Sequence, residues 1–182
     1  MTAIILIAIV AILVLWTVSV QRKLVKQEEI CKNGLSQIGV QQSNRWDALK
    51  ALAELTKSYS DYEYKTITDT IAMRRPVTAS STGADADAQD KLFAQALSHL
   101  NVVVEKYPEL KASENYGKTM DSVNMYTQQV RMSQMVYNDS VTNYNRLIRQ
   151  FPDSIVASLF HFAQRDYLQV NEAKSEIPSM KL

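Results

Sequence analysis

The sequence predicts an all-α protein in which an N-terminal transmembrane helix continues into an elongated antiparallel helical bundle of about four helices. Three observations favour this fold class. Seventeen of the first twenty residues are apolar and none is charged. Apolar residues then recur every three or four positions along most of the chain, which is the spacing of one helix face. The 182 residues include only four Gly and four Pro, too few for the turns of a sheet made from many short strands.

The apolar segment at residues 3–20 suits a membrane span. As a helix it extends about 27 Å, close to the ~30 Å hydrocarbon core of a bilayer. Arg22, Lys23 and Lys26 follow it directly, whereas a cleavable signal peptide carries its positive charges before the apolar run. A pilin-like start is disfavoured because no charged leader precedes the run. We therefore interpret residues 1–20 as an uncleaved anchor, and the positive-inside rule predicts a short N-terminus outside and the remainder in the cytoplasm.

Residues 21–172 are predicted to form the bundle, and residues 173–182 a C-terminal tail. The first helix is expected to continue from the membrane to about Arg74, because no proline interrupts the chain before Pro76. The next segment, the loop 76–90, contains small and polar residues. Any bend in the first helix is expected near its two glycines, at positions 34 and 39.

Three further helices are expected, at Asp90 to Lys106, at a region ended by Phe151-Pro152, and at Ile155 to Val170. The middle one has the clearest signal in the chain, because ten positions follow one another in alternating steps of four and three residues. Such spacing indicates a bundle core or a coiled-coil seam, and the sequence does not separate a contact within the chain from one between copies. The ten positions are Tyr116, Met120, Val123, Thr127, Val130, Gln134, Tyr137, Val141, Tyr144 and Ile148.

The composition gives little support for catalytic, metal or nucleic-acid chemistry. The chain has two His and one Cys, and neither His has a Glu three residues before it, as a four-helix di-iron site requires. Twenty Lys and Arg balance nineteen Asp and Glu, so no basic excess favours nucleic acid. We therefore expect no enzyme activity, no cofactor and no nucleic-acid partner.

A repeated dipeptide stands out in the helix expected before Phe151-Pro152. Tyr137-Asn138 and Tyr144-Asn145 lie seven residues apart and hence on one face. Two interpretations remain open. The asparagines form a polar recognition strip, or the tyrosines belong to the seam and the asparagines bond a neighbouring helix or water.

The order of several short motifs resembles the LemA family of bacterial membrane-anchored helical proteins. The resemblance extends from the anchor to about Leu168, and it implies a single-pass protein of the bacterial cytoplasmic membrane. The chain departs from the family pattern at Leu35, where the family has Trp, and at residues 50–52, where a proline-containing bend is missing. The motifs are Ser36 to Gln41 with Arg45, Thr56-Lys57-Ser58-Tyr59, Tyr107-Pro108-Glu109-Leu110-Lys111-Ala112, and Tyr137-Asn138 with Tyr144-Asn145 and the closing Phe151-Pro152.

We expect a non-enzymatic scaffold that self-associates and organises the membrane or partner proteins. An adaptor or sensor that binds a peptide or signalling protein in a bundle groove is the alternative. The expected partners are the lipid bilayer, further copies of the chain and, in either case, a possible protein partner. One apolar face is the candidate for contact between copies, and a second set of apolar residues is of the kind that a scaffold needs. They are a membrane-proximal stripe of Leu24, Cys31, Leu35 and Ile38, and three methionines outside the seam, Met125, Met132 and Met135.

Overall fold

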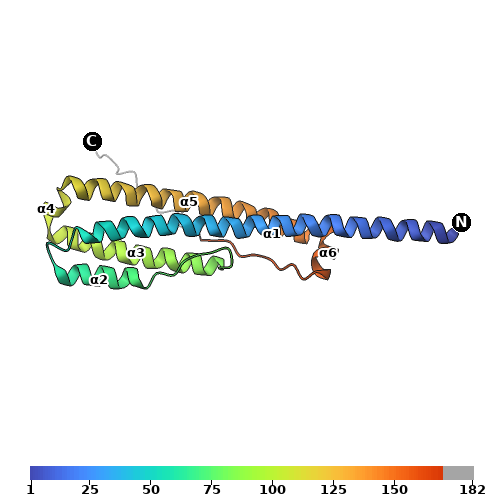
Figure 1. Ribbon diagram of the computed structural model, residues 1–182, viewed down its shortest axis with the longest axis horizontal. Helices are drawn as coiled ribbons and strands as arrows, with labels where there is room; N and C mark the ends of the chain where they lie inside the picture. Colours follow the sequence, from blue (N-terminus) through green and yellow to red (C-terminus); the bar gives the residue numbers. More distant parts are fainter. Residues whose placement is uncertain (170–182) are drawn as a thin grey trace, which may run out of the picture.

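A computed structural model describes residues 1–169 of the chain and shows an elongated bundle from which one helix projects (Figure 1). Over this range the structure has six helices and no strand, which confirms the all-α fold class. The expected tail at 173–182 lies outside the described residues. The helices are α1 (Thr2–Glu54), α2 (Asp61–Ala72), α3 (Gly83–Lys106), α4 (Pro108–Lys111), α5 (Glu114–Arg149) and α6 (Asp153–Leu159).

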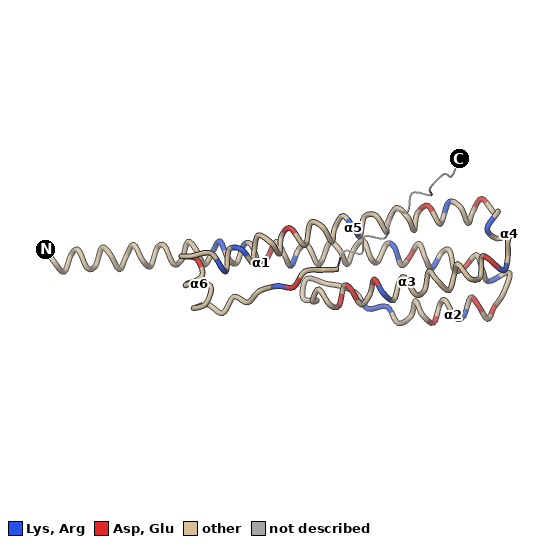
Figure 2. The backbone as a smooth tube through the Cα atoms, turned by 180° about the vertical axis from the view of Figure 1, so that it is seen from behind, with Lys and Arg blue, Asp and Glu red and all other residues tan. Residues whose placement is uncertain are grey.

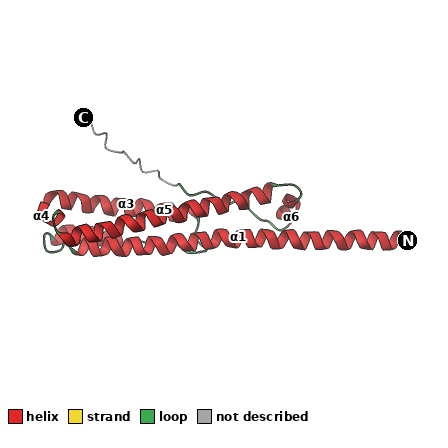
Figure 3. Cartoon of the chain, turned by 90° about the horizontal axis from the view of Figure 1, so that it is seen from above, coloured by secondary structure: helices red, strands yellow, loops and turns green. Residues whose placement is uncertain are grey.

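The N-terminal part of α1 projects beyond the other helices (Figure 3). Val20 is the first residue of α1 that the rest of the chain buries. An eighteen-residue window near this end is apolar enough to cross a membrane, and only 6% of it is buried. The projecting part therefore coincides with the predicted anchor at residues 1–20, and its length and composition are consistent with membrane anchoring.

The prediction of one helix from the membrane to Arg74 is wrong. Helix α1 ends at Glu54, and after a turn the chain returns in α2 beside α3. Ser60 caps the new helix by accepting a hydrogen bond from the backbone N–H of Glu63 at 3.3 Å. A capping serine is a local signal for the start of a helix. The apolar spacing of three and four residues did not reveal the turn, because α2 also buries apolar residues such as Ile67 and so carries the same spacing.

The predicted loop 76–90 is too long, since α3 begins at Gly83 rather than at Asp90. Thr82 and Asp85 form a reciprocal capping box. The Thr82 hydroxyl accepts from the Asp85 N–H at 3.2 Å, and the Asp85 carboxylate accepts from the Thr82 N–H at 2.7 Å. Carboxylates suit the first turn of a helix because free N–H groups point at them. The acidic run therefore belongs to the helix.

Helix α1 continues without interruption through Gly34 and Gly39, the two positions considered for a bend. Both glycines mark close approaches instead. A Cβ on Gly39 would overlap the carbonyl oxygen of Val77, in the loop that crosses α1. A Cβ on Gly34 would lie 3.2 Å from the ring of Tyr137 in α5.

The long seam predicted for the region before Phe151 is the inner face of α5. Eight of its ten positions are buried, and Met120 and Thr127 are half-buried. Helix α5 lies along α1 for most of its length (Figure 1). The seam is therefore a contact within one chain, which the sequence alone did not establish.

Helix α6 ends at Leu159, so the predicted fourth helix from Ile155 to Val170 is wrong beyond its first turn. His161 has a φ of 59°. The N–H of Phe162 bonds the carbonyl of Ala157 at 3.0 Å and that of His161 bonds Ser158 at 3.3 Å. This pattern is a Schellman motif, which commonly carries glycine at the left-handed position. Because histidine stands there instead, the end of the helix has no recognisable signal in the sequence.

Candidate functional site

The predicted self-association stripe lies inside the folded chain. Leu24, Cys31, Leu35 and Ile38 are each 0% exposed, in one apolar cluster with Tyr137, Val141 and Tyr144 of α5. This candidate for contact between copies is therefore covered within its own chain and offers no surface to a second copy. Helix α5 has 36 residues and reaches back along α1 toward the membrane-proximal end.

Burial also determines the chemistry of Cys31. Removal from water raises the pKa of its thiol, and the nearby charge of Arg165 only partly opposes this effect. Since the thiolate is the reactive form, a buried thiol with a raised pKa is a poor nucleophile. Cys31 is therefore a packing residue.

The two asparagines of the Tyr-Asn repeat hold an extended segment of the same chain, residues 162–169, against α5. The side-chain amide of Asn138 donates to the carbonyl of Leu168 at 3.0 Å, and its oxygen accepts from the N–H of Leu168 at 2.9 Å. Asn145 makes the same pair of bonds with Arg165, at 2.8 and 2.9 Å. Each amide side chain thus satisfies both backbone groups of one residue.

The spacing of the repeat matches the spacing of its partners. Seven residues of α-helix rise about 10.5 Å, and three residues of extended chain span about 10 Å. Asn138 and Asn145 therefore meet Leu168 and Arg165 in register. The tyrosines belong to the seam, as one interpretation held, but the asparagines bond an extended segment rather than a neighbouring helix. They recognise extended backbone, which is closer to the recognition strip of the other interpretation.

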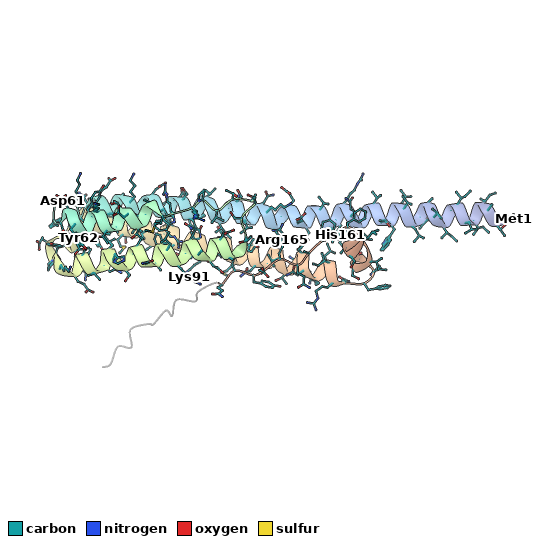
Figure 4. All side chains as sticks on the ribbon, turned by 90° about the horizontal axis from the view of Figure 1, so that it is seen from below. Met1, Asp61, Tyr62, Lys91, His161 and Arg165 are labelled. Atoms are coloured by element: carbon teal, nitrogen blue, oxygen red, sulfur yellow. The ribbon has the colours of Figure 1, made fainter. Side chains whose placement is uncertain are left out.

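Arg165 fastens the extended segment to α1 as well. Its guanidinium donates to the Glu28 carboxylate at 3.1 Å and lies 6.0 Å from the ring centroid of Tyr144. Figure 4 shows Arg165 and His161 along this segment, between α6 and the start of α3. The segment therefore contacts both α1 and α5.

Two further parts of the motifs that carry the family resemblance, Tyr107-Pro108 and Phe151-Pro152, are connections between helices. Tyr107 ends α3, and Pro108 begins the short α4 at the end of the bundle far from the anchor. The ring of Tyr107 packs 5.6 Å from that of Tyr59 in the turn after α1. Phe151-Pro152 connects α5 to α6 at the opposite end, where Phe151 is exposed.

A polar layer around Asp90 separates the two apolar clusters of the bundle. The Asp90 carboxylate accepts hydrogen bonds from Gln42 at 3.1 Å, from Arg45 and from Gln134. Gln42, Arg45 and Gln134 are at most 5% exposed. Three helices, α1, α3 and α5, therefore meet at one carboxylate.

Arg45 is the buried charge of this layer. Burial lowers the pKa of its guanidinium, and the charge of Asp90 opposes that effect. The guanidinium carbon lies 4.0 Å from the ring centroid of Phe93, where a cation is attracted to the aromatic face. Sequence reasoning missed this cluster, because its members come from three separate regions of the chain and none belongs to a recognised chemical motif.

A pocket of about 260 Å³ lies beside the polar layer, lined by Gly39, Gln42, Ser43, Trp46 and residues 74–77. Its arginine Arg74 pairs with Asp47 at 2.9 Å. In the part of the chain that the structure describes, no group of three or more His, Cys, Asp or Glu side chains is placed to hold a metal ion.

The outward face of α5 is an uncharged surface rich in methionine, and we call it the α5 outer surface. Met125, Met132 and Met135 are 47, 56 and 52% exposed, as expected for residues outside the seam. Arg131 is the only charged residue between Asp121 and Asp139. Flexible methionine side chains adapt to varied partners. The surface consists of Met125, Gln128, Gln129, Met132, Met135 and Val136, with a shallow groove beside Gln41 of α1.

These features define a class of protein: a helical bundle on a long helix whose apolar end suits a membrane anchor. Within that class, the model of the LemA family matches residues 34–182. The chain therefore belongs to the LemA family, and the resemblance carried by its motifs is confirmed. No curated protein sequence matches the chain.

Proposed function

We propose that this chain is a non-enzymatic, membrane-anchored scaffold whose copies associate side by side through the α5 outer surface. The observation that carries the proposal is that surface itself. It continues over about three helical turns without a charged residue, and its exposed side chains are methionine, glutamine and valine. Exposed apolar surface of this kind is typical of contacts between proteins.

The arrangement of the helices supports contact between copies. Helix α5 lies alongside α1, so its outer surface runs parallel to the anchor (Figure 1). Copies anchored in one membrane share an orientation and meet with parallel axes. Confinement to the same bilayer raises their effective concentration, so even a weak surface associates.

For location, the proposal is the bacterial cytoplasmic membrane, with the bundle in the cytoplasm and a short N-terminus outside. Arg22, Lys23 and Lys26 support this orientation. An Ala79→Cys variant in a Cys31→Ala background tests it, since Ala79 is exposed. We expect a membrane-impermeant thiol reagent to label the introduced thiol only after cells are opened. Rapid labelling of intact cells would show that the bundle lies outside the cytoplasm.

Disulfide crosslinking tests the scaffold. We expect Met132→Cys, in the full-length Cys31→Ala protein, to form crosslinked dimers under mild oxidation in membranes. Val102→Cys is the matched control, because Val102 is 49% exposed but lies on α3. A second variant, Met125→Glu with Met132→Glu, should reduce the mass of the detergent-solubilised protein in light scattering. Monomers at every concentration, without a crosslink at position 132, would rule the scaffold out.

One observation favours the adaptor as a second candidate. Asn138 and Asn145 bind extended backbone through paired hydrogen bonds that do not depend on side-chain identity. A partner peptide can form the same bonds with Asn138 and Asn145 when residues 162–169 dissociate from α5. A labelled peptide with the sequence of residues 162–169 should bind a variant truncated after His161 whose helix content is unchanged. The same truncation carrying Asn138→Ala and Asn145→Ala should not bind it.

A further inference from the structure

The end of the bundle nearest the anchor exposes apolar side chains on and beside α6. The same short helix buries Val156 and Ala157, each 2% exposed, against α1 and α5. A surface helix with apolar residues on both faces is unusual in water. The exposed set, which we call the α6 patch, consists of Phe151, Ile155, Leu159 and Phe160, which are 77, 57, 66 and 48% exposed.

The α6 patch carries no unpaired charge. Between Phe151 and Gln164 the only Lys, Arg, Asp or Glu is Asp153. Its carboxylate pairs with the ammonium group of Lys23 at 2.9 Å. Charge therefore does not oppose transfer of the patch out of water.

The position of α6 along α1 identifies what covers the patch. Lys23 is the third residue after Val20, the last residue of the predicted span. Val20 shares an apolar cluster with the buried face of α6, and Trp16 packs against that cluster. Figure 2 shows α6 at the level where the first basic residues follow the uncharged projecting part of α1. Trp16 and Lys23 are only about 10 Å apart along the helix axis.

We propose that the α6 patch inserts into the interfacial layer of the bilayer that α1 spans and forms a second membrane contact. Aromatic and aliphatic side chains at this depth lie where headgroups meet acyl chains. Arg22 and Lys26 lie in the same turns of α1 as Lys23, at a level that suits anionic headgroups. The inference rests on the membrane anchor of the proposed function but not on association between copies.

Depth-dependent quenching tests this contact in the full-length Cys31→Ala protein in phosphatidylcholine and phosphatidylglycerol vesicles. Single cysteines replace Phe160 and Val102 and carry a polarity-sensitive fluorophore. The two positions are matched, at 48 and 49% exposed, but Val102 lies toward the far end of the bundle. With lipids that carry a nitroxide close to the headgroup, we expect the label at position 160 to lose about half of its fluorescence. The label at position 102 should lose none.

A third label, at Val10→Cys in the projecting part of α1 and measured with lipids that carry the nitroxide deep in the acyl chains, separates the two possible failures. If the label at position 10 is quenched by lipid but the label at 160 behaves like the one at 102, the α6 contact is wrong and the anchor stands. If the label at position 10 is also unquenched, the anchor itself fails. A label at 160 that is shielded from water but not quenched means that protein covers the patch, which also overturns the proposal. Circular dichroism of each labelled variant verifies that the bundle is folded.

Discussion

The guanidinium of Arg45 in α1 pairs with the carboxylate of Asp90 in α3 between two apolar clusters. Arg45 is 5% exposed, so Asp90 rather than water compensates its positive charge. Gln42 and Gln134 donate to the same carboxylate and fix its position. The register of three helices is therefore linked to one acidic side chain.

Removal of Asp90 should destabilise the bundle strongly. Asp90→Ala leaves the Arg45 guanidinium buried without its partner, and we expect the free energy of unfolding to fall by about 3–5 kcal/mol. Denaturant unfolding of the full-length protein in detergent, followed by circular dichroism, measures this change. Asp69→Ala is the control because Asp69 is exposed on α2. Equal effects of the two substitutions would contradict the role of the layer.

Two glycines should respond to alanine in opposite directions. Gly39→Ala places a methyl group into the carbonyl oxygen of Val77, so we expect a loss of about 1–3 kcal/mol. Gly117 in α5 has open space around it, and Gly117→Ala should stabilise its helix by about 0.5–1 kcal/mol. The two midpoints of denaturant unfolding give the signs directly. A stabilising Gly39→Ala would mean that the 73–82 loop does not cross α1 at this point.

The centre of the α5 seam should not accept a carboxylate. Val130 is 1% exposed, and Val130→Asp buries an unpaired charge at a cost of several kcal/mol. Val102→Asp makes the same chemical change at a residue that is 49% exposed, and it should have little effect. Thermal unfolding of both full-length variants compares them. If both variants show similar shifts in melting temperature, Val130 is not buried in the seam.

Alkaline pH should weaken the fold. Burial raises the pKa of Cys31 from an ordinary 9.0, and it raises the pKa of Tyr137 and Tyr144 from 10.0. The unfolded chain releases these protons first as pH rises, so these three groups add no pH dependence below about pH 8, and the free energy of unfolding should fall above pH 9. Denaturant unfolding across this range measures the slope. Cys31→Ala should remove the earliest part of the loss, and an unchanged profile would show that the thiol ionises as freely in the folded state.

The paired hydrogen bonds of Asn145 should keep the extended segment 162–169 bound to α5. Asn145→Ala leaves the N–H and carbonyl of Arg165 without these partners, so hydrogen exchange in residues 163–169 should become faster. Exchange in the centre of α5 should stay slow. Asn124→Ala, at an exposed position of the same helix, is the control. If exchange in 163–169 is the same in both variants, the asparagines do not hold the segment.

The features that the sequence predicted are those determined by local periodicity. The inner face of α5 was predicted because each seam position repeats the spacing of its neighbours, and Phe93 and Leu100 of α3 are buried for the same reason. The uncharged run of the anchor is equally local. The features that were missed depend on contacts across the chain. Helix α1 ends where α2 begins to return, and the apolar spacing does not change there.

The candidate surfaces divide in the same way. The exposure of Met132 follows from its position relative to the seam, and the sequence was sufficient for it. The burial of Leu35 depends on how far α5 reaches along α1, which no local pattern encodes. The role of Asn138 depends on an extended partner thirty residues later that resembled a helix in the sequence. The polar layer was missed for a related reason, since Asp90 had been assigned to the edge of a loop.

The unbroken α1 has a mechanical consequence. Between Val20 and Glu54 it has no interruption, so the span and the far end of the bundle move as one lever. This arm is about 51 Å long. Transmembrane helices tilt in response to bilayer thickness, and a tilt of about 10° would displace the α1–α2 turn by about 9 Å. A change in membrane thickness would thus move the α1–α2 turn sideways at the opposite end of the molecule.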